Sequence, residues 1–341
     1  MKKIVLFLVC CTVGLLYAQE HITLKIASVA PNRSPWDIEM KKIAAEWNKI
    51  TDGLVEVKLY NMRTLGGEKS GIQKLKAARP GQKAPLDGAI FTTIGLHELV
   101  PEAYMYTLTL PFLIQNQQEL DTVLNVHGKK IEDKIKAAGY ELIIWSNVGW
   151  ASFYAKDPFY TLAALKKIKF SVSGLDSPIL SDSFKVSGFN VIDTPVQKFA
   201  QSLKSKNGLR GFLAVHLLTY ATGFYKDIRY ALDVKLCPIM AGFVISADVW
   251  NKIPAKYHAA MKEAIEKTRK RLNDALDSTD RDCIEKMEAD GVTMIRLSKE
   301  ELKQWGEEFN ENIEAIHRTL PNAFDMEMYK DIKKLLAPMR K

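Results

Sequence analysis

The residues of this chain that could do chemistry are scattered rather than grouped. Its six histidines are isolated from one another. The chain has no His-Glu-x-x-His metal site, no Cys-x-x-Cys pair and no Gly-x-Ser-x-Gly nucleophile turn. Residues 66–71 have the glycine spacing of a phosphate-binding loop, but Ile72 stands where that loop requires lysine. The sequence therefore predicts a protein that is not an enzyme and holds no metal or cofactor.

Three residues with reactive side chains have two interpretations each. His216 lies in the apolar run 213–218, which is typical of a buried, hydrogen-bonded core histidine, with a functional role as the alternative. Cys237 and Cys283 are the cysteines beyond the N-terminal segment, and an oxidising compartment would permit a bridge between them. We expect two buried thiols instead, because Cys283 continues the apolar stripe of a predicted helix.

The composition is that of a soluble globular protein. The 341 residues are 47% apolar and 26% charged, with 48 Lys and Arg against 40 Asp and Glu. The length favours two domains, and the composition excludes a disordered chain or a small disulfide-rich fold. No basic cluster interleaved with aromatic residues is present, which argues against nucleic-acid binding.

The N-terminus has the pattern of a secretory signal. Two lysines precede an apolar run at residues 4–17, and the small residue Ala18 follows it. This pattern predicts a signal peptide over residues 1–18, since a permanent anchor needs about 20 apolar residues. Lipid attachment at Cys10 or Cys11 is the less favoured alternative, because the apolar stretch before them is short.

The elements that follow alternate between strands and helices. Strands are predicted at 21–27 and 54–60, with a helix between them that begins at Ser34-Pro35. Two more strands are predicted at 141–146 and 151–155, on either side of Gly149. Strand–helix–strand units of this kind indicate an α/β fold.

A long helix bears on the domain organisation. Residues 254–290 contain no glycine and no internal proline, which predicts one helix of up to 37 residues, about 55 Å long. Such a helix exceeds one small domain and would span two. We expect two lobes, each a central sheet flanked by helices. Their predicted bounds are residues 19–147 plus about 238–270 for lobe one, and 148–237 plus about 271–341 for lobe two.

The ordered set of these segments resembles the DctP-like solute-binding proteins of tripartite ATP-independent periplasmic (TRAP) transporters. The resemblance covers nearly all of the chain beyond the signal. Its segments are Thr51-Asp52-Gly53-Leu54-Val55-Glu56-Val57, Leu65-Gly66-Gly67-Glu68, Leu110-Pro111-Phe112-Leu113, Leu165-Lys166-Lys167-Ile168-Lys169-Phe170-Ser171-Val172, Asn207-Gly208-Leu209-Arg210-Gly211 and Phe224-Tyr225-Lys226.

This resemblance implies a two-lobed, periplasmic-binding-protein-like fold and a function. The protein would be periplasmic, close its lobes around a small-molecule ligand, and deliver it to the membrane permease subunits of a TRAP transporter. It looks like the subset of the family that is associated with a tetratricopeptide-repeat periplasmic protein and with hydrophobic ligands.

Departures from the family pattern shape the expected ligand site. The family arginine that grips an organic acid is replaced by Ser171, and a second family arginine falls near Trp150 or Ala151. Arg210 or Lys169 could supply a replacement cation. We expect an apolar or amphipathic ligand, bound by residues that are small, polar and neutral, or aromatic: Ala30, Phe91, Thr92, Trp150, Ala151, Ser171 and Ala214. For Phe91 and Trp150 the alternative is that both are core residues.

Two other functions remain open from the sequence. One is a secreted enzyme on an α/β scaffold, and the other is a periplasmic lipid carrier that is not coupled to a permease. Fold resemblance alone does not separate them, because one fold serves many functions.

Overall fold

A computed structural model describes residues 21–77, 82–172 and 177–340 of the chain. The predicted signal peptide and both candidate lipidation sites lie outside the described residues. The described strands form one mixed nine-stranded sheet. The strands are β1 (Ile22–Ser28), β2 (Val55–Asn61), β3 (Gly88–Thr92), β4 (Tyr140–Ala155), β5 (Phe170–Ser171), β6 (Gly211–Val215), β7 (Tyr230–Leu232), β8 (Cys237–Ser246) and β9 (Thr293–Ile295).

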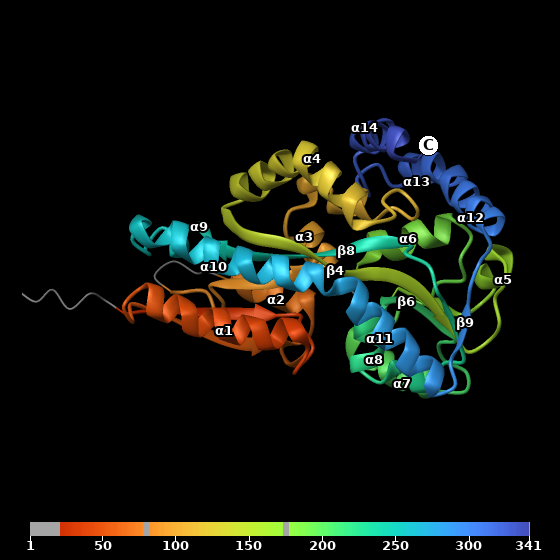
Figure 1. Ribbon diagram of the computed structural model, residues 1–341, viewed down its shortest axis with the longest axis horizontal. Helices are drawn as coiled ribbons and strands as arrows, with labels where there is room; N and C mark the ends of the chain where they lie inside the picture. The colour runs from red at the N-terminus through yellow and green to blue at the C-terminus, as the bar shows by residue number, and fades with distance from the viewer. Residues whose placement is uncertain (1–20, 78–81, 173–176, 341) are drawn as a thin grey trace, which may run out of the picture.

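Helices cover both faces of this sheet (Figure 1). The α-helices are α1 (Pro35–Ile50), α2 (Glu68–Lys76), α3 (Thr93–Leu99), α4 (Gln117–Ala137), α5 (Leu162–Lys166), α6 (Pro178–Val186), α7 (Val196–Lys204), α8 (His216–Ala221), α9 (Ala247–Trp250), α10 (Ala255–Asp274), α11 (Leu276–Ala289), α12 (Lys299–Glu311), α13 (Ile313–Thr319) and α14 (Met326–Leu336). Short 3-10 helices are η1 (Met62–Leu65), η2 (Pro101–Ala103), η3 (Met105–Thr109), η4 (Phe224–Asp227) and η5 (Ala337–Arg340).

Two long strands join the halves of the molecule. The main path of the sheet is β2-β1-β3-β8-β4-β6-β5, with β7 pairing with β4 and β9. Strand β4 pairs with β8 along most of its length, and its C-terminal part also pairs with β6. The two lobes are therefore halves of one sheet, with β4 and β8 passing from one half to the other.

The middle of β4 is irregular where it crosses between the halves. The sequence predicted two strands around Gly149, whereas the structure has one strand whose register shifts between Asn147 and Trp150. Gly149 has φ +146°, and a Cβ there would lie 2.8 Å from the Cβ of Val215. Glycine is needed because this bulge combines a positive φ with close approach of β6.

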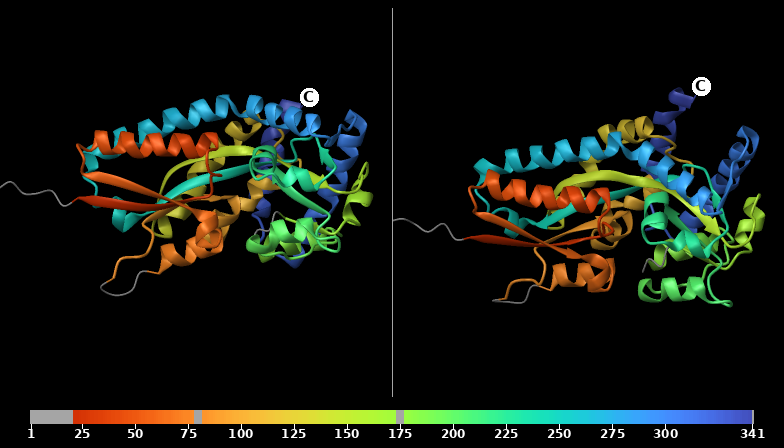
Figure 2. Two further views of the ribbon diagram at one scale, coloured as in Figure 1. Left: turned by 90° about the horizontal axis from the view of Figure 1, so that it is seen from below. Right: turned by 60° about the horizontal axis from the view of Figure 1, so that its bottom comes forward.

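The first half has a layer of two helices on one face of its strands. Figure 2 shows α1 and α10 side by side on that face, with α2 and α3 on the other. Trp47 of α1 is fully buried, stacks on Phe243 of β8, and donates a hydrogen bond from Nε1 to the Met261 carbonyl of α10 at 2.9 Å. Helix α1 begins as predicted, because Ser34 caps it and Pro35 is its first residue.

The predicted long helix is broken once. Helices α10 and α11 are separated by Ala275, whose φ and ψ are −89° and −4°. Helix α10 packs on α1 in the first half, and α11 packs on α8 in the second. The helical segment therefore spans both halves, as expected, but as two helices with a break at the crossing.

The C-terminal residues lie elsewhere than predicted. The sequence placed all of residues 271–341 in lobe two, but α14 packs against α4 and η3 of the first half. Arg340 donates to the buried Glu119 of α4 at 2.6–2.8 Å. The apolar face of α14 could be read from the sequence, but the surface that it covers could not. We propose a lobe boundary between α13 and α14, at residues 320–325, because α13 still packs on α12 and on α6 of the second half.

Candidate ligand-binding site

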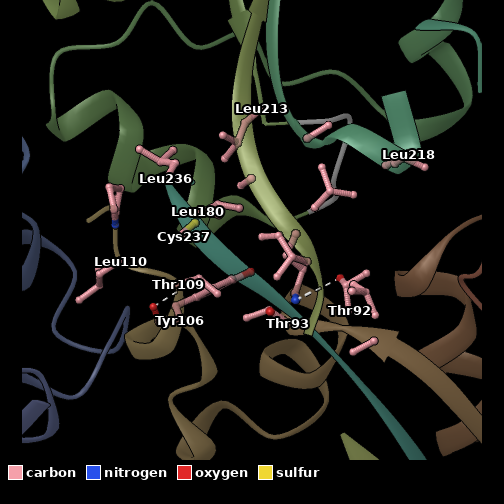
Figure 3. Close-up of a pocket in the computed structure, with 18 of the residues that line it drawn as sticks. Thr92, Thr93, Tyr106, Thr109, Leu110, Leu180, Leu213, Leu218, Leu236 and Cys237 are labelled. Atoms are coloured by element: carbon pink, nitrogen blue, oxygen red, sulfur yellow. Dashed lines mark hydrogen bonds between the residues drawn. The ribbon is translucent and has the colours of Figure 1, made fainter. Parts of the chain in front are cut away.

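A cavity of about 210 Å³ lies between the two halves of the molecule. The first half contributes residues 28–31 after β1, residues 90–94 from β3 and α3, and residues from η3 to Pro111. The second half contributes parts of α6, β6 and α8, together with the crossing strands β4 and β8. Figure 3 shows side chains from both halves pointing into this space.

The lining of the cavity carries no ionisable Asp, Glu, His, Lys or Arg side chain among the described residues. Leucine, isoleucine, valine, alanine and phenylalanine dominate it. The leucines and phenylalanines that contribute are Leu110, Leu180, Phe184, Leu213, Leu217, Leu218, Leu236, Phe309 and Phe324. Such a wall gains affinity from buried apolar area and offers no guanidinium or ammonium group to a carboxylate.

Ser28 and the labelled residues Thr92, Thr93, Tyr106 and Thr109 (Figure 3) form a polar wall on the first half, while Ser183 of α6 and Ser187, its C-cap, line the cavity from the second half. Thr92 donates from Oγ1 to Glu68 Oε1 at 2.6 Å and accepts from the Ile94 amide at 3.3 Å. Thr93 Oγ1 donates to the Met240 carbonyl at 3.3 Å and accepts from the amide of the same residue at 3.0 Å. These hydroxyl groups are already satisfied by the protein, so the wall is polar but neutral.

Tyr106 links the two halves beside the cavity. Its hydroxyl donates to Ser177 Oγ at 2.8 Å, and Ser177 in turn donates to Glu98 Oε1 at 3.0 Å. Thr109 donates to the Tyr106 carbonyl at 3.2 Å, as the dashed line in Figure 3 marks. Ser177 belongs to the second half and caps α6, so this chain of hydrogen bonds bridges the lobes.

One half-buried carboxyl group lies directly behind the polar wall. Glu68 accepts hydrogen bonds from the amide and the hydroxyl of Thr92, at 2.9 and 2.6 Å. Burial raises the pKa of Glu68 to about 7, against the opposing effect of hydrogen bonds from Thr92 and the Gly95 amide. Gly95 permits this approach, because a Cβ there would lie 2.0 Å from Glu68 Oε2. Glu68 thus holds the start of α3 and does not line the cavity.

The structure brings four of the seven predicted site residues to the cavity wall. They are Ala30, Thr92, Ala151 and Ala214. The other three are buried close by without lining the cavity: Phe91, Trp150 and Ser171. Successive side chains of a strand point to opposite faces, so Thr92 and Ala151 face the cavity while their neighbours Phe91 and Trp150 face the core.

The three residues outside the cavity have specific surroundings. Phe91 is fully buried in the core of the first half, next to Gly95. Trp150 is 1% exposed, and the ammonium group of Lys235 lies 5.3 Å from its ring centroid. Ser171 is buried in β5 opposite Phe212 of β6.

The cations that could have replaced the family arginine are engaged away from the cavity. The guanidinium of Arg210 forms a two-point ion pair with the carboxylate of Asp157. Lys169 donates to the Asn207 carbonyl at 3.3 Å. Neither side chain lines the cavity.

The cysteines and His216 take the expected buried forms. Cys237 and Cys283 are both buried free thiols, and Cys237 lines the cavity, where burial raises the pKa of its thiol to about 12. His216 is 4% exposed, and its Nδ1 lies 2.6 Å from the Tyr154 hydroxyl. Burial lowers the pKa of His216 to about 4, so its imidazole is neutral at pH 7.

Much of the lining was not predicted from the sequence. Side chains of α6, α8 and α13 enter the cavity, including Leu180, Leu218 and Ile313. Their apolar stripes indicated buried helices, but the pattern does not say whether a buried face meets the core or a cavity. Local periodicity therefore could not have separated these residues from ordinary core residues.

A second hollow lies between α4, β4 and α10. It has a volume of about 890 Å³ and is lined largely by charged and amide side chains. Charges on its wall pair with neighbours, as Arg269 does with Glu266 at 2.8 Å. The second hollow draws on a single half of the molecule, so closing the lobes would not enclose a ligand there.

Two structural absences apply to the part of the chain that is described. No group of three or more His, Cys, Asp or Glu side chains there could hold a metal ion. No helix there is both long and apolar enough to cross a membrane.

Comparison with known proteins points to one family. The sequence profile of the bacterial extracellular solute-binding proteins, family 7 (DctP), matches residues 26–319. A solute-binding protein of Chromohalobacter salexigens is 22% identical over 246 residues, which are 71% of this chain and 70% of that protein.

Solved structures share the fold. A TRAP periplasmic solute-binding protein of Desulfovibrio salexigens, with bound orotic acid, has a TM-score of 0.79 at 17% identity, covering 93% of this chain and 99% of that chain. The sugar acid binding protein DctPAm of Advenella mimigardefordensis, in complex with galactonate, has a TM-score of 0.79 at 20% identity. The match covers 94% of this chain and 99% of that chain. A TRAP periplasmic solute-binding protein of C. salexigens, with bound D-glucuronate, has a TM-score of 0.77 at 19% identity. The match covers 92% of this chain and 99% of that chain.

Proposed function

The chain belongs to the bacterial extracellular solute-binding proteins, family 7, and from that premise we propose that it binds an uncharged, apolar or amphipathic ligand between its lobes. Proteins of this family are periplasmic binding proteins of TRAP transporters rather than enzymes. Export through a cleaved signal peptide, delivery to the permease subunits and a tetratricopeptide-repeat partner are parts of this proposal that follow from the resemblance.

The observation that carries the proposed ligand class is the uncharged cavity wall. The ligands named for the solved relatives, orotic acid, galactonate and D-glucuronate, are all acids. A carboxylate enclosed in the cavity described here would meet no cation among the lining residues. An unpaired buried charge loses several kcal/mol of hydration, so these acids are disfavoured.

The size of the cavity limits the size of the ligand. A cavity of about 150 Å³ in another protein holds benzene. The 210 Å³ here suits a ligand of roughly eight to ten carbon atoms by the same scale. The threonine hydroxyls have used their protons within the protein but keep an acceptor lone pair, so the wall favours a ligand hydroxyl group at one end, with the hydrocarbon part against the leucines of the second half.

Calorimetric titration with straight-chain alcohols tests the proposed ligand class. Each buried CH₂ group contributes about 0.8 kcal/mol, so affinity is expected to rise about four-fold per carbon from hexanol to decanol. Decanoate, D-glucuronate and galactonate should bind far more weakly than decanol. Micromolar binding of either sugar acid, with no binding of the alcohols, would refute the proposed ligand class.

A matched pair of variants separates charge from size. Ala214→Arg places a cation in the cavity wall, whereas Ala214→Met adds a side chain of similar length without charge. Decanol affinity is expected to fall at least ten-fold more for Ala214→Arg than for Ala214→Met, because the guanidinium would be buried without a partner. Equal losses in both variants would show that only the volume of the cavity matters.

A further inference from the structure

The net positive charge of the protein is concentrated in one segment. Residues 148–237 contain twelve Lys and Arg against six Asp and no Glu, a net charge of +6. The rest of the chain from residue 19 contains 34 basic and 34 acidic residues and is neutral overall. An uneven distribution of this kind creates a directed electrostatic field around the protein.

Basic residues of this segment gather on α7 and the turn after it. Lys198, Lys204 and Lys206 are exposed there, and residues 196–208 contain no acidic residue. Among the described residues, none of the three lysines takes part in an ion pair. Their charges therefore face solvent without a neutralising neighbour.

The first half carries charges of the same sign on η1 and α2. Arg63, Lys69 and Lys76 are exposed there. The acidic residue of this stretch, Glu68, points inward to Thr92 and has a pKa raised to about 7 by burial. Both elements therefore present positive charge to solvent.

These two basic surfaces meet where the two halves of the molecule approach each other. Gln197 of α7 donates from Nε2 to the Gly66 carbonyl at 3.0 Å, which joins the start of α7 to the turn between η1 and α2. In the right-hand view of Figure 2, α2 and α7 lie next to each other at the bottom, one on each half. We call the six exposed residues Arg63, Lys69, Lys76, Lys198, Lys204 and Lys206 the basic rim.

We propose that the basic rim docks on the anionic phospholipid headgroups of a membrane, with this side of the molecule toward the bilayer. Lysine and arginine near an anionic lipid surface are attracted to it, and several together give measurable binding. Docking in this orientation brings the cavity between the lobes next to the phase in which an apolar ligand dissolves. The docking itself rests on the charges alone and not on the proposed ligand class.

An anionic solute steered into the cleft is the competing explanation for a positive rim. The cavity behind the rim offers no ionisable basic side chain among its described lining residues, so a steered anion would not be held. Nearby carboxylates reduce the positive charge but do not cancel it. Asp157 pairs with Arg210, Asp182 and Asp193 share Lys185, and Asp227 lies in η4, which packs on α7. The net charge of +6 for residues 148–237 already counts these carboxylates. The basic rim has positive charges on both halves of the molecule. A flat, anionic membrane surface can contact both sets of charges at once, whereas a small solute cannot.

Vesicle flotation tests the docking with the mature protein. Vesicles of phosphatidylcholine mixed with phosphatidylglycerol should carry the protein at low salt, and pure phosphatidylcholine vesicles should not. The triple variant Lys198→Gln, Lys204→Gln, Lys206→Gln is expected to bind the anionic vesicles about a hundred-fold more weakly. Its thermal unfolding midpoint and its decanol affinity should match the wild type, since these lysines are exposed and lie outside the cavity.

The matched control removes three exposed lysines from the opposite side of the molecule. The variant Lys134→Gln, Lys136→Gln, Lys330→Gln changes α4 and α14, which lie far from α7 in Figure 1. It should bind anionic vesicles within a few-fold of the wild type. Equal losses in both triple variants, or no binding of the wild type to anionic vesicles, would overturn the docking surface. Failure of alcohol binding would instead bear on the proposed ligand alone.

Discussion

Replacing Asp280 by asparagine should change how stability depends on pH. Asp280 of α11 is 6% exposed and accepts a hydrogen bond from the amide of Trp150, at the bulge of β4. Among the described residues its Oδ1 has no hydrogen-bond partner. Burial raises the pKa of Asp280 to about 7, against the opposing effects of the Trp150 hydrogen bond and the nearby charge of Lys235. Asparagine can accept the same hydrogen bond without a charge.

The sign and size of the effect follow from proton linkage. Between the unfolded pKa of 3.8 and the folded value of about 7, the folded protein holds the proton of Asp280 more tightly than the unfolded chain does. The free energy of unfolding of the wild type therefore falls as pH rises through this window. Relative to Asp280→Asn, the fall should be about 1.4 kcal/mol per pH unit, reaching about 4 kcal/mol above pH 7.

Guanidinium unfolding followed by tryptophan fluorescence, repeated from about pH 5 to pH 8, measures this difference. Comparing variant with wild type at each pH removes the contributions of other groups with shifted pKa values, such as Glu68 and His216. Asp282→Asn is the matched control, because Asp282 is an exposed carboxylate on the same helix, α11, and does not contribute to the raised pKa of Asp280. A stability difference between Asp280→Asn and wild type that does not change with pH would show that Asp280 is ionised in the folded protein.

Two further predictions concern the second half. Phe153 is fully buried, with five aromatic ring centroids 5.6–6.5 Å away, so Phe153→Ala should lower the free energy of unfolding by about 3–5 kcal/mol. Tyr160→Ala, at a 59% exposed side chain, should change it by less than about 0.5 kcal/mol, and equal effects would contradict the packing described here. Neither Cys237 nor Cys283 should react with a thiol reagent in the native protein, and both should react after unfolding. Fast reaction of Cys237 in the native state would show that the cavity opens to solvent.

The order of elements was predictable because local signals coincide with it. Ser34-Pro35 begins α1, and Ser298 with Glu301 forms the capping box that starts α12. The sequence pattern predicts two strands separated by Gly149, yet this glycine lies within one strand, because the bulge lets β4 continue past it. A glycine in a strand is compatible with a turn or with a bulge, and only pairing with β6 and β8 decides between them.

The candidate ligand site was predictable only in part. The absence of the family arginine at Ser171 indicated an uncharged cleft, and the described wall is indeed free of ionisable Asp, Glu, His, Lys and Arg side chains. Which side chain of each adjacent pair faces the cavity depends on strand orientation, so Phe91 and Trp150 were grouped with Thr92 and Ala151. The sequence pattern of α6 and α13 predicts buried helices but does not indicate where in the fold these helices pack.

The two shared strands have a consequence for how such a protein can be cut or recombined. Strand β8 follows β7 of the second half in the chain, yet it pairs with β3 of the first half. Helix α14, at the end of the chain, returns to pack on α4. A gene fragment that encodes either lobe alone would lack strands or helices that complete its own core. Recombination at a single point in the gene therefore cannot exchange one whole lobe between relatives. In such a protein, ligand specificity changes instead by substitutions within the cleft.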